Sequence, residues 1–233
     1  MGDELDPRKL VAEAIGPFAL VFAGAGSIVL AAGNANIGLI EIALAHGLAI
    51  ALLISALGHI SGGHFNPAVT AGFWVTRRIS TTLAIGYVLA QLTGGILGAL
   101  ALTLLFPEGL REAANLGTPA LGPGVDFGKA VGIEIILTFF LVMVIFGTAV
   151  DRRSANLGGL AIGLTITMDI IAAGPLTGAV MNPARALGPA LLTGTWDDHL
   201  VWWIGPVIGG VIAAMVYHYL FSEEAEQGAA AAS

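Results

Sequence analysis

Residues 61–68 read Ser-Gly-Gly-His-Phe-Asn-Pro-Ala, and residues 177–184 read Thr-Gly-Ala-Val-Met-Asn-Pro-Ala. In both stretches a glycine-containing segment leads into Asn-Pro, which opens an apolar run about half as long as a bilayer requires. Proline is favourable at the first position of a helix, because its missing N–H has no partner there in any case. Asparagine directly before it is a good N-cap. The sequence therefore predicts two short helices, over about 66–76 and 182–192, each beginning at its asparagine.

The composition places the rest of the chain in a membrane. Of 233 residues, 56% are hydrophobic and only 11% are charged, against about 25% charged in soluble domains. The mean hydropathy of +0.88 also excludes a disordered chain. Since a membrane-spanning helix needs about 20 mostly apolar residues, we predict six spans. They lie at about 10–32, 37–58, 82–106, 128–150, 156–174 and 200–221.

The two halves of the chain repeat one another. Three features recur: Asn66-Pro67-Ala68 as Asn182-Pro183-Ala184, Glu13 as Glu134, and Gly94-Gly95 as Gly209-Gly210. Each half holds three spans, an odd number, so the second half must cross the membrane upside down. We therefore expect an all-α integral membrane protein with six spans, two re-entrant half-helices and an inverted repeat, which places a site near the bilayer midplane. It forms one channel domain over 1–233: repeat one at about 8–106, a connecting loop at 107–127, and repeat two at about 128–221.

The positive charges predict the orientation, because Lys and Arg favour the cytoplasmic side. With six spans and an N-terminus inside, three basic pairs fall on one side: Arg8 and Lys9, Arg77 and Arg78, Arg152 and Arg153. Both termini, which carry short acidic tails, are therefore expected in the cytoplasm, and the cell membrane is the expected location. The net charge of −7 argues against a nucleic-acid partner.

The two half-helices indicate a conduit for small neutral molecules. If they enter from opposite faces, their N-termini meet, and each carries roughly half a positive charge. The two asparagine amides add N–H donors. Irregular backbone at membrane depth is tolerated where it lines a wet cavity, so the preceding loops are expected to offer carbonyl acceptors to the lumen. These pore-lining carbonyls belong to Gly62, Gly63, His64 and Phe65, and to Gly178, Ala179, Val180 and Met181.

With these motifs the chain resembles the aquaporin, or major intrinsic protein, family over about residues 8–221. The resemblance implies an hourglass pore in each protomer, a homotetramer, and Glu13 and Glu134 as acceptors for backbone N–H groups of the two loops. It also implies a selectivity filter, which here reads His46, Ile170, Ala179 and Arg185. This set is similar to the filters of plant tonoplast intrinsic proteins, relatives that pass water and in some cases ammonia, urea or hydrogen peroxide.

The residues of this filter fit a passage for neutral molecules that is wider than in strict water channels. Ile170 gives an apolar wall, and Ala179 is small, so the gap should widen on that side. His46 offers a donor or an acceptor, and Arg185 supplies a fixed charge that excludes cations. We expect a passive channel for water, with ammonia, hydrogen peroxide or urea as further solutes, that excludes ions and protons.

Other functions are less favoured by the sequence. Glycerol facilitators usually carry Asp where this chain has Ala186, and Trp202-Trp203 matches the water-channel pattern. An ion-coupled transporter usually needs a chain of membrane carboxylates, and with Glu13 and Glu134 committed to the loops only Asp169 is left. A structural junction protein with a closed pore is disfavoured because the filter residues leave room. The chain has no cysteine and nothing that resembles a metal cluster, a nucleophile triad or a phosphate loop. An enzyme, a cofactor and a bound metal are therefore not expected.

Overall fold

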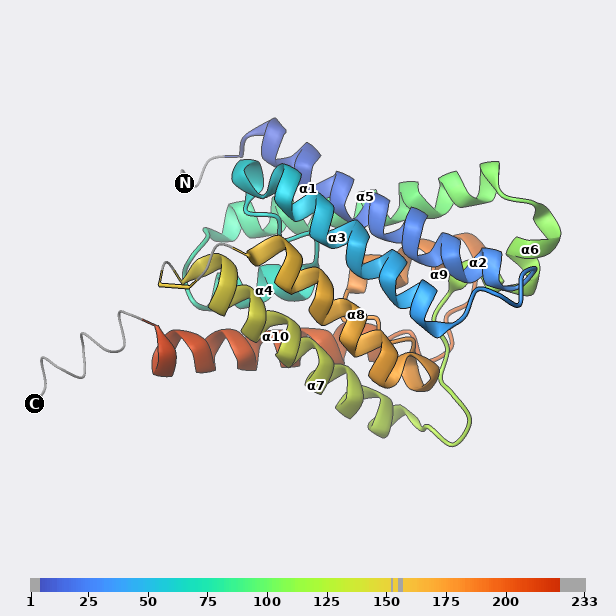
Figure 1. Cartoon of the computed structure of the whole chain (residues 1–233). Coiled ribbons are helices and arrows are strands. Elements are labelled where there is room, and N and C mark those ends of the chain that lie inside the picture. Colours follow the sequence, from blue (N-terminus) through green and yellow to red (C-terminus); the bar gives the residue numbers. More distant parts are fainter. Residues whose placement is uncertain (1–4, 152, 155–156, 223–233) are drawn as a thin grey trace, which may run out of the picture.

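The computed structural model describes residues 5–151, 153–154 and 157–222 (Figure 1). All regular structure in this part of the chain is helical, and six of its helices are long and apolar enough to span a membrane, which confirms the predicted fold class. Three spans are single helices: α3 (Leu39–Ser61), α5 (Thr81–Leu105) and α8 (Gly158–Thr177). The others include a π-helical turn: α1 (Pro7–Ala19), η1 (Leu20–Ala25) and α2 (Gly26–Ala31); α7 (Phe127–Ile145) and η3 (Phe146–Val150); α10 (Val201–Val216) and η4 (Tyr217–Phe221).

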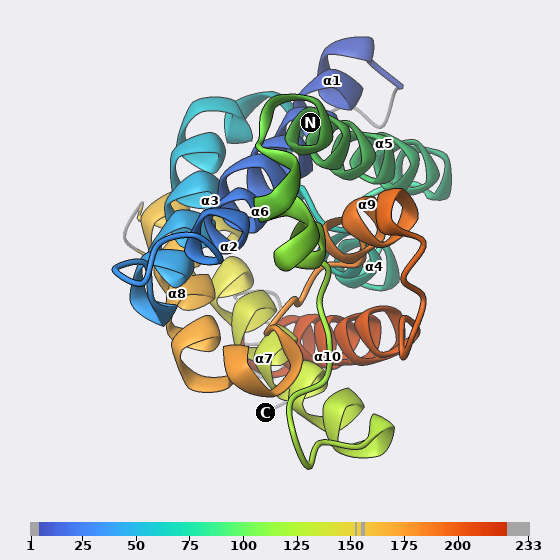
Figure 2. The ribbon, with the colours of Figure 1, turned by 90° about the vertical axis from the view of Figure 1, so that its right-hand side faces the viewer.

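The two half-helices are α4 (Pro67–Val75) and α9 (Pro183–Thr193). In each, the asparagine N-cap has an extended backbone and its side-chain oxygen accepts the N–H of the alanine two residues later. Figure 1 shows α4 toward the end of the bundle where both termini lie, which we call the terminal end, and α9 toward the opposite end. Seen along the bundle, both lie between α5 and α10 (Figure 2).

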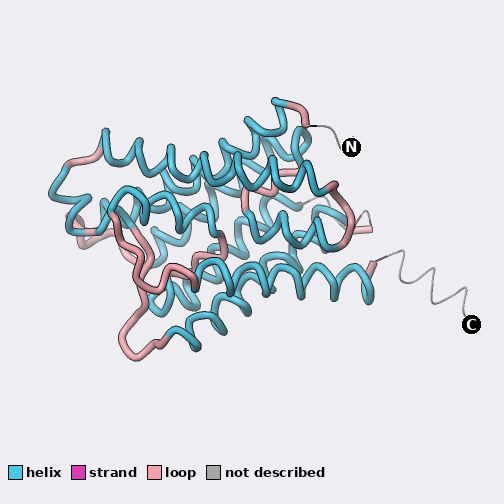
Figure 3. The backbone as a smooth tube through the Cα atoms, turned by 180° about the vertical axis from the view of Figure 1, so that it is seen from behind, coloured by secondary structure: helices cyan, strands magenta, loops and turns pink. Residues whose placement is uncertain are grey.

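The structure differs in several details from what the sequence predicts. The first span starts at Pro7, because the Asp6 side chain caps the helix at the Arg8 N–H, a signal that a hydropathy pattern does not register. The fifth span runs through Pro175 to Thr177. The connecting loop contains the short helix α6 (Glu108–Ala113) and the 3-10 turn η2 (Asn115–Gly117), between the loop segments seen in Figure 3.

Glycines allow the helices to approach one another closely. The main helix pairs are α3 with α8, α1 with α5, and α7 with α10, and α9 packs on α5. A side chain on Gly94 would overlap the Ala14 carbonyl of α1, and one on Gly209 would overlap the Ile135 carbonyl of α7. Helices in lipid associate through such small-residue contacts. The repeated glycine pairs therefore act in the same way in both halves.

We expect Gly188→Ala to destabilise the protein, because a methyl group there would overlap backbone atoms of Gly95 in α5. Overpacking of this kind costs about 1–3 kcal/mol in free energy of unfolding. The control is Gly132→Ala on α7, where nothing lies within 4 Å of the added carbon. Unfolding of the detergent-solubilised variants checks this, and equal stability of the two would contradict it.

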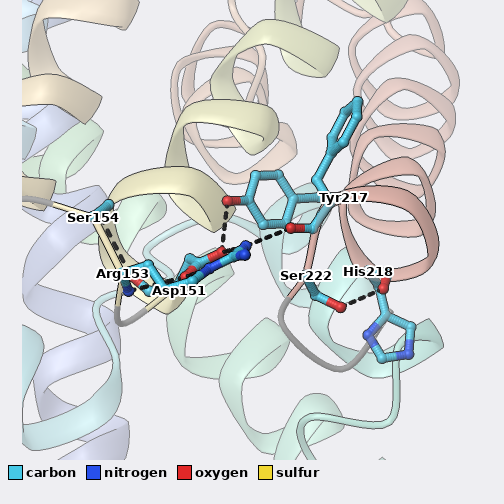
Figure 4. Close-up of polar contacts among 7 residues, drawn as sticks. Asp151, Arg153, Ser154, Tyr217, His218 and Ser222 are labelled. Atoms are coloured by element: carbon cyan, nitrogen blue, oxygen red, sulfur yellow. Dashed lines mark hydrogen bonds and ion pairs between the residues drawn. The ribbon is translucent and has the colours of Figure 1, made fainter. Parts of the chain in front are cut away.

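A polar cluster at the terminal end joins the loop after the fourth span to the end of the sixth (Figure 4). Arg153 Nη2 lies 2.6 Å from Asp151 Oδ2, and the same nitrogen donates to the Phe221 carbonyl at 2.5 Å. The Tyr217 hydroxyl donates to Asp151 Oδ2 at 3.0 Å. The Asp151 carboxylate therefore holds two segments that are distant in the sequence.

This cluster should make stability depend on pH. The hydrogen bonds from Arg153 hold the pKa of the Asp151 carboxyl below its usual range. The contact therefore stabilises the folded state above the ordinary aspartate pKa of about 4, and the stability is lost as pH falls below that value. We expect Asp151→Asn to lower the unfolding temperature at pH 7 and to weaken its dependence on pH below about 4. Identical pH profiles for the variant and the wild type would contradict this.

Candidate functional site

A buried carboxylate holds the loop that leads into α4. Glu13 in α1 has no exposed surface. Its Oε1 accepts the Ser61 hydroxyl at 2.7 Å and the His64 N–H at 2.9 Å. Its Oε2 accepts the Phe65 N–H and the Gln91 side-chain amide, both at 2.7 Å. A carboxylate at membrane depth needs such donors, because an unpaired charge there is costly.

Glu134 in α7 holds the second loop in the same way. Its Oε1 accepts the Thr177 hydroxyl at 2.8 Å and the Val180 N–H at 2.9 Å, and its Oε2 accepts the Met181 N–H at 2.8 Å. These donors occupy the positions in repeat two that Ser61, His64 and Phe65 occupy in repeat one. Sequence reasoning identified the two glutamates but missed the hydroxyl pair. The alignment of the repeats, which places Ser61 opposite Thr177, contains that signal.

The loops adopt a backbone that L-residues rarely enter. Phe65 has a φ of +51° and Met181 of +53°, and Ala179 lies at +45°. Such left-handed conformations cost about 1–2 kcal/mol each for residues with a Cβ. Gly62 and Gly178 end the preceding spans at φ of +94° and +84°, where glycine carries no such penalty. The glutamate hydrogen bonds to the Phe65 and Met181 N–H groups offset the strain at those two positions, and the Ala179 N–H donates to the Thr177 hydroxyl oxygen at 3.2 Å.

Two large aromatic residues fix the ends of the spans that enter the loops. Tyr87 in α5 donates its hydroxyl to the Ser61 carbonyl at 2.6 Å, and Trp202 in α10 donates its indole N–H to the Thr177 carbonyl at 2.9 Å. Both side chains are almost fully buried. They satisfy helix-end carbonyls that have no partner within the helix. Sequence reasoning did not assign either residue this role.

The two asparagines bind across the centre of the molecule. Asn66 Nδ2 donates to the Met181 carbonyl at 2.7 Å, and Asn182 Nδ2 donates to the Phe65 carbonyl at 2.9 Å. Each loop therefore holds the N-cap of the other half-helix. An asparagine amide has two N–H donors, so each keeps one that is not used in this bond.

A narrow cavity passes beside these asparagines. It is lined by residues 63–66 and 179–182 of the two loops and otherwise mainly by apolar side chains of the spans. The volume open to water-sized molecules is about 30 Å³, and one water needs roughly 10–15 Å³ on this measure. The cavity therefore fits a short file of water molecules rather than a broad aqueous space.

Two of the predicted pore-lining residues do not line this cavity. Gly62 and Gly178 are the left-handed C-caps of α3 and α8, so they turn the chain out of the helix before the lining begins. Gly178 packs near Pro119 of the connecting loop. Gly62 instead lines a second hollow of about 530 Å³, which shares Ile54 with the cavity and also contains His59. The residues that line it come from the C-terminal part of α3 and from residues 149 and 157–160.

The four predicted filter residues meet in the same cavity. His46 from α3, Ile170 from α8, Ala179 from the second loop and Arg185 from α9 all line it, and each is at most 5% exposed. Arg185 Nη1 donates to the Gly117 carbonyl at 2.8 Å. Gly117, which belongs to η2, is a partner that sequence reasoning missed, because it lies in the connecting loop.

His46 and Arg185 also contact one another. His46 Nδ1 lies 2.8 Å from the Ile42 carbonyl, and its Nε2 lies 3.3 Å from Arg185 Nη2. A carbonyl only accepts, so Nδ1 carries the ring hydrogen, and Nε2 of the neutral ring accepts from the guanidinium. The two polar residues therefore hold one another in place, and Ile170 and Ala179 line the same cavity.

Comparison with known proteins agrees with this geometry. The family model for the major intrinsic protein matches residues 4–217. Aquaporin TIP4-4 of Zea mays is 45% identical over 92% of this chain and 86% of its own length. Aquaporin-8 of Mus musculus is 38% identical over 93% of this chain and 83% of its own.

Solved structures lead to the same family. The crystal structure of the aquaglyceroporin from Plasmodium falciparum superposes with a TM-score of 0.84 at 25% identity, covering 94% of this chain and 98% of that one. The family match and the plant TIP relatives confirm the resemblance seen in the motifs. The chain belongs to the major intrinsic protein family, the aquaporin family of multi-pass membrane channels.

Proposed function

We propose that the protein is a passive channel for water and for small neutral solutes such as ammonia, hydrogen peroxide or urea, and that it excludes ions and protons. The observation that carries this proposal is the pair of crossed bonds from Asn66 to Met181 and from Asn182 to Phe65 beside the cavity. They leave two N–H donors and the N-termini of two half-helices at one point. That arrangement attracts an oxygen atom and repels a cation.

Proton exclusion follows from the same point. A water molecule that accepts from both asparagines uses its oxygen lone pairs there, so its hydrogens point along the file in opposite directions. It cannot then accept a proton from a neighbouring water, and the positive helix ends oppose a hydronium ion. Water still passes, because loop carbonyls offer acceptors on either side of the centre.

The filter sets which neutral solutes enter. We assign His46, Ile170, Ala179 and Arg185 to this role, with Arg185 as the fixed charge that opposes cations. The apolar Ile170 and the small Ala179 leave room on one side, which favours entry of solutes slightly larger than water. Arg185 uses one N–H on His46 Nε2 and one on the Gly117 carbonyl. The guanidinium has five N–H donors, so the others are offered to the solute.

We further propose the placement and assembly of the channel. The basic residues Arg8, Arg78 and Arg153 belong to segments at the terminal end, so both termini are assigned to the cytoplasm by the positive-inside rule. The cell membrane is the proposed location. The family resemblance supports a homotetramer, with one pore in each protomer. As a member of a channel family, the protein is assigned no catalysed reaction and no cofactor.

Two other functions are less well supported. For glycerol transport, Ala186 is fully buried where facilitators usually carry Asp, and the cavity is narrow. For ion-coupled transport, Glu13 and Glu134 are each bonded to several loop donors and are not free to exchange a charge. Asp169 is 1% exposed and is not among the residues that line the cavity.

Reconstituted vesicles test the proposed function. We expect the wild-type protein to raise osmotic water permeability, measured by stopped-flow light scattering, well above that of empty liposomes. A pH-sensitive dye inside the same vesicles should show no proton leak. Ammonia, urea and hydrogen peroxide are measured in parallel. Water permeability equal to that of empty liposomes would refute the proposal.

Arg185→Val should loosen selectivity. Removal of the guanidinium opens space and removes the fixed charge, so we expect glycerol permeability to rise by about tenfold, the change that ~1.4 kcal/mol off a barrier produces. Arg185→Lys is the matched control, because it keeps the charge and should keep cations out. If solute and cation fluxes through Arg185→Val, like those through Arg185→Lys, equal the wild-type fluxes, Arg185 does not act in the filter.

A further inference from the structure

A π-helical turn interrupts the first span beside the filter. The turn is η1, Leu20–Ala25, between α1 and α2. Such turns occur often at functional sites. Gly24 lies in it, and a methyl group on Gly24 would be 2.5 Å from His46 Nε2 and 2.7 Å from His46 Cγ. These distances are too short for real contacts, so the imidazole ring occupies its place only because residue 24 has no side chain.

The ring has little freedom to give way. Its Nδ1 is bonded to the Ile42 carbonyl and its Nε2 to Arg185, and the residue is 5% exposed. His46 lines the cavity, whereas Gly24 does not, so Gly24 contacts the ring from the wall side. A methyl group at residue 24 would therefore push the ring toward the lumen or break one of its two bonds.

The same turn supports the other polar residue of the filter. Ala25 packs against Gly117, whose Cα is so close that a Cβ there would be 2.9 Å from the Ala25 Cβ. The Gly117 carbonyl accepts from Arg185 Nη1. Gly24 and Ala25, which are adjacent in the turn, therefore position both polar residues of the filter. Gly24 contacts His46 directly, and Ala25 supports Arg185 through Gly117 of the connecting loop.

We propose that the η1 turn is a positioning element of the filter. Gly24 sets the width of the filter, because its lack of a side chain allows the His46 ring to pack against the first span. The proposal rests on the proposed function of the pore. It assigns a selectivity role to a residue that does not touch the solute.

The test is Gly24→Ala in proteoliposomes, with water and urea permeability measured side by side. We expect the urea-to-water permeability ratio to fall by roughly tenfold, the scale on which one methylene changes discrimination in an apolar site. Gly132→Ala, whose added carbon meets nothing within 4 Å, is the control and should keep the wild-type ratio. A wild-type ratio in Gly24→Ala would overturn the proposal.

A double variant separates positioning from general damage to the fold. In a His46→Ala background the ring is absent, so adding Gly24→Ala should change the ratio no further. If Gly24→Ala lowers the ratio equally in both backgrounds, the effect does not act through His46 and the inference is wrong. If the proposed function itself is wrong, the result differs: vesicles with the wild-type protein are then no more permeable to water than empty ones.

Discussion

Two carboxylates buried at membrane depth, each bonded to the backbone of a re-entrant loop, are the interaction on which the structure depends. A charged group in that position is costly without donors, and a loop with several left-handed residues is strained without support. Glu13 and Glu134 meet both needs at once, because the loop N–H groups satisfy the carboxylates while the carboxylates fix the loops. Either part alone would be unstable in lipid.

The rest of the pore follows from loops held in this way. Fixed loops bring the two asparagines within reach of the opposite loop's carbonyls, and the half-helices then point their positive ends at one place in the cavity. At one end of that cavity, the connecting loop and the first span brace Arg185 and His46. The centre is nearly symmetric because each repeat supplies an asparagine N-cap and a glutamate that holds its loop. His46 and Arg185 have no polar counterparts, since the positions 116 residues away are Ile162 and Val69.

The sequence predicted the features that repeat within it and missed those that depend on contacts across it. The paired Asn-Pro-Ala motifs and the two glutamates were visible because they recur at matching positions. Tyr87, Trp202 and Gly117 were not, since their roles come from carbonyls or side chains that only the folded chain brings near. Gly62 and Gly178 were predicted to line the pore, but they are the C-caps of α3 and α8 and are not among the residues that line the central cavity.

Amide hydrogen exchange tests the central role of the carboxylates most directly. The N–H groups of His64, Phe65, Val180 and Met181 lie outside helices, yet they should exchange as slowly as those of the spans, because each donates to a buried glutamate. Glu134→Gln should speed exchange at Val180 and Met181 and leave the other two protected. If all four exchange in the wild type as fast as the connecting loop around Pro119, the carboxylates do not hold the pore together.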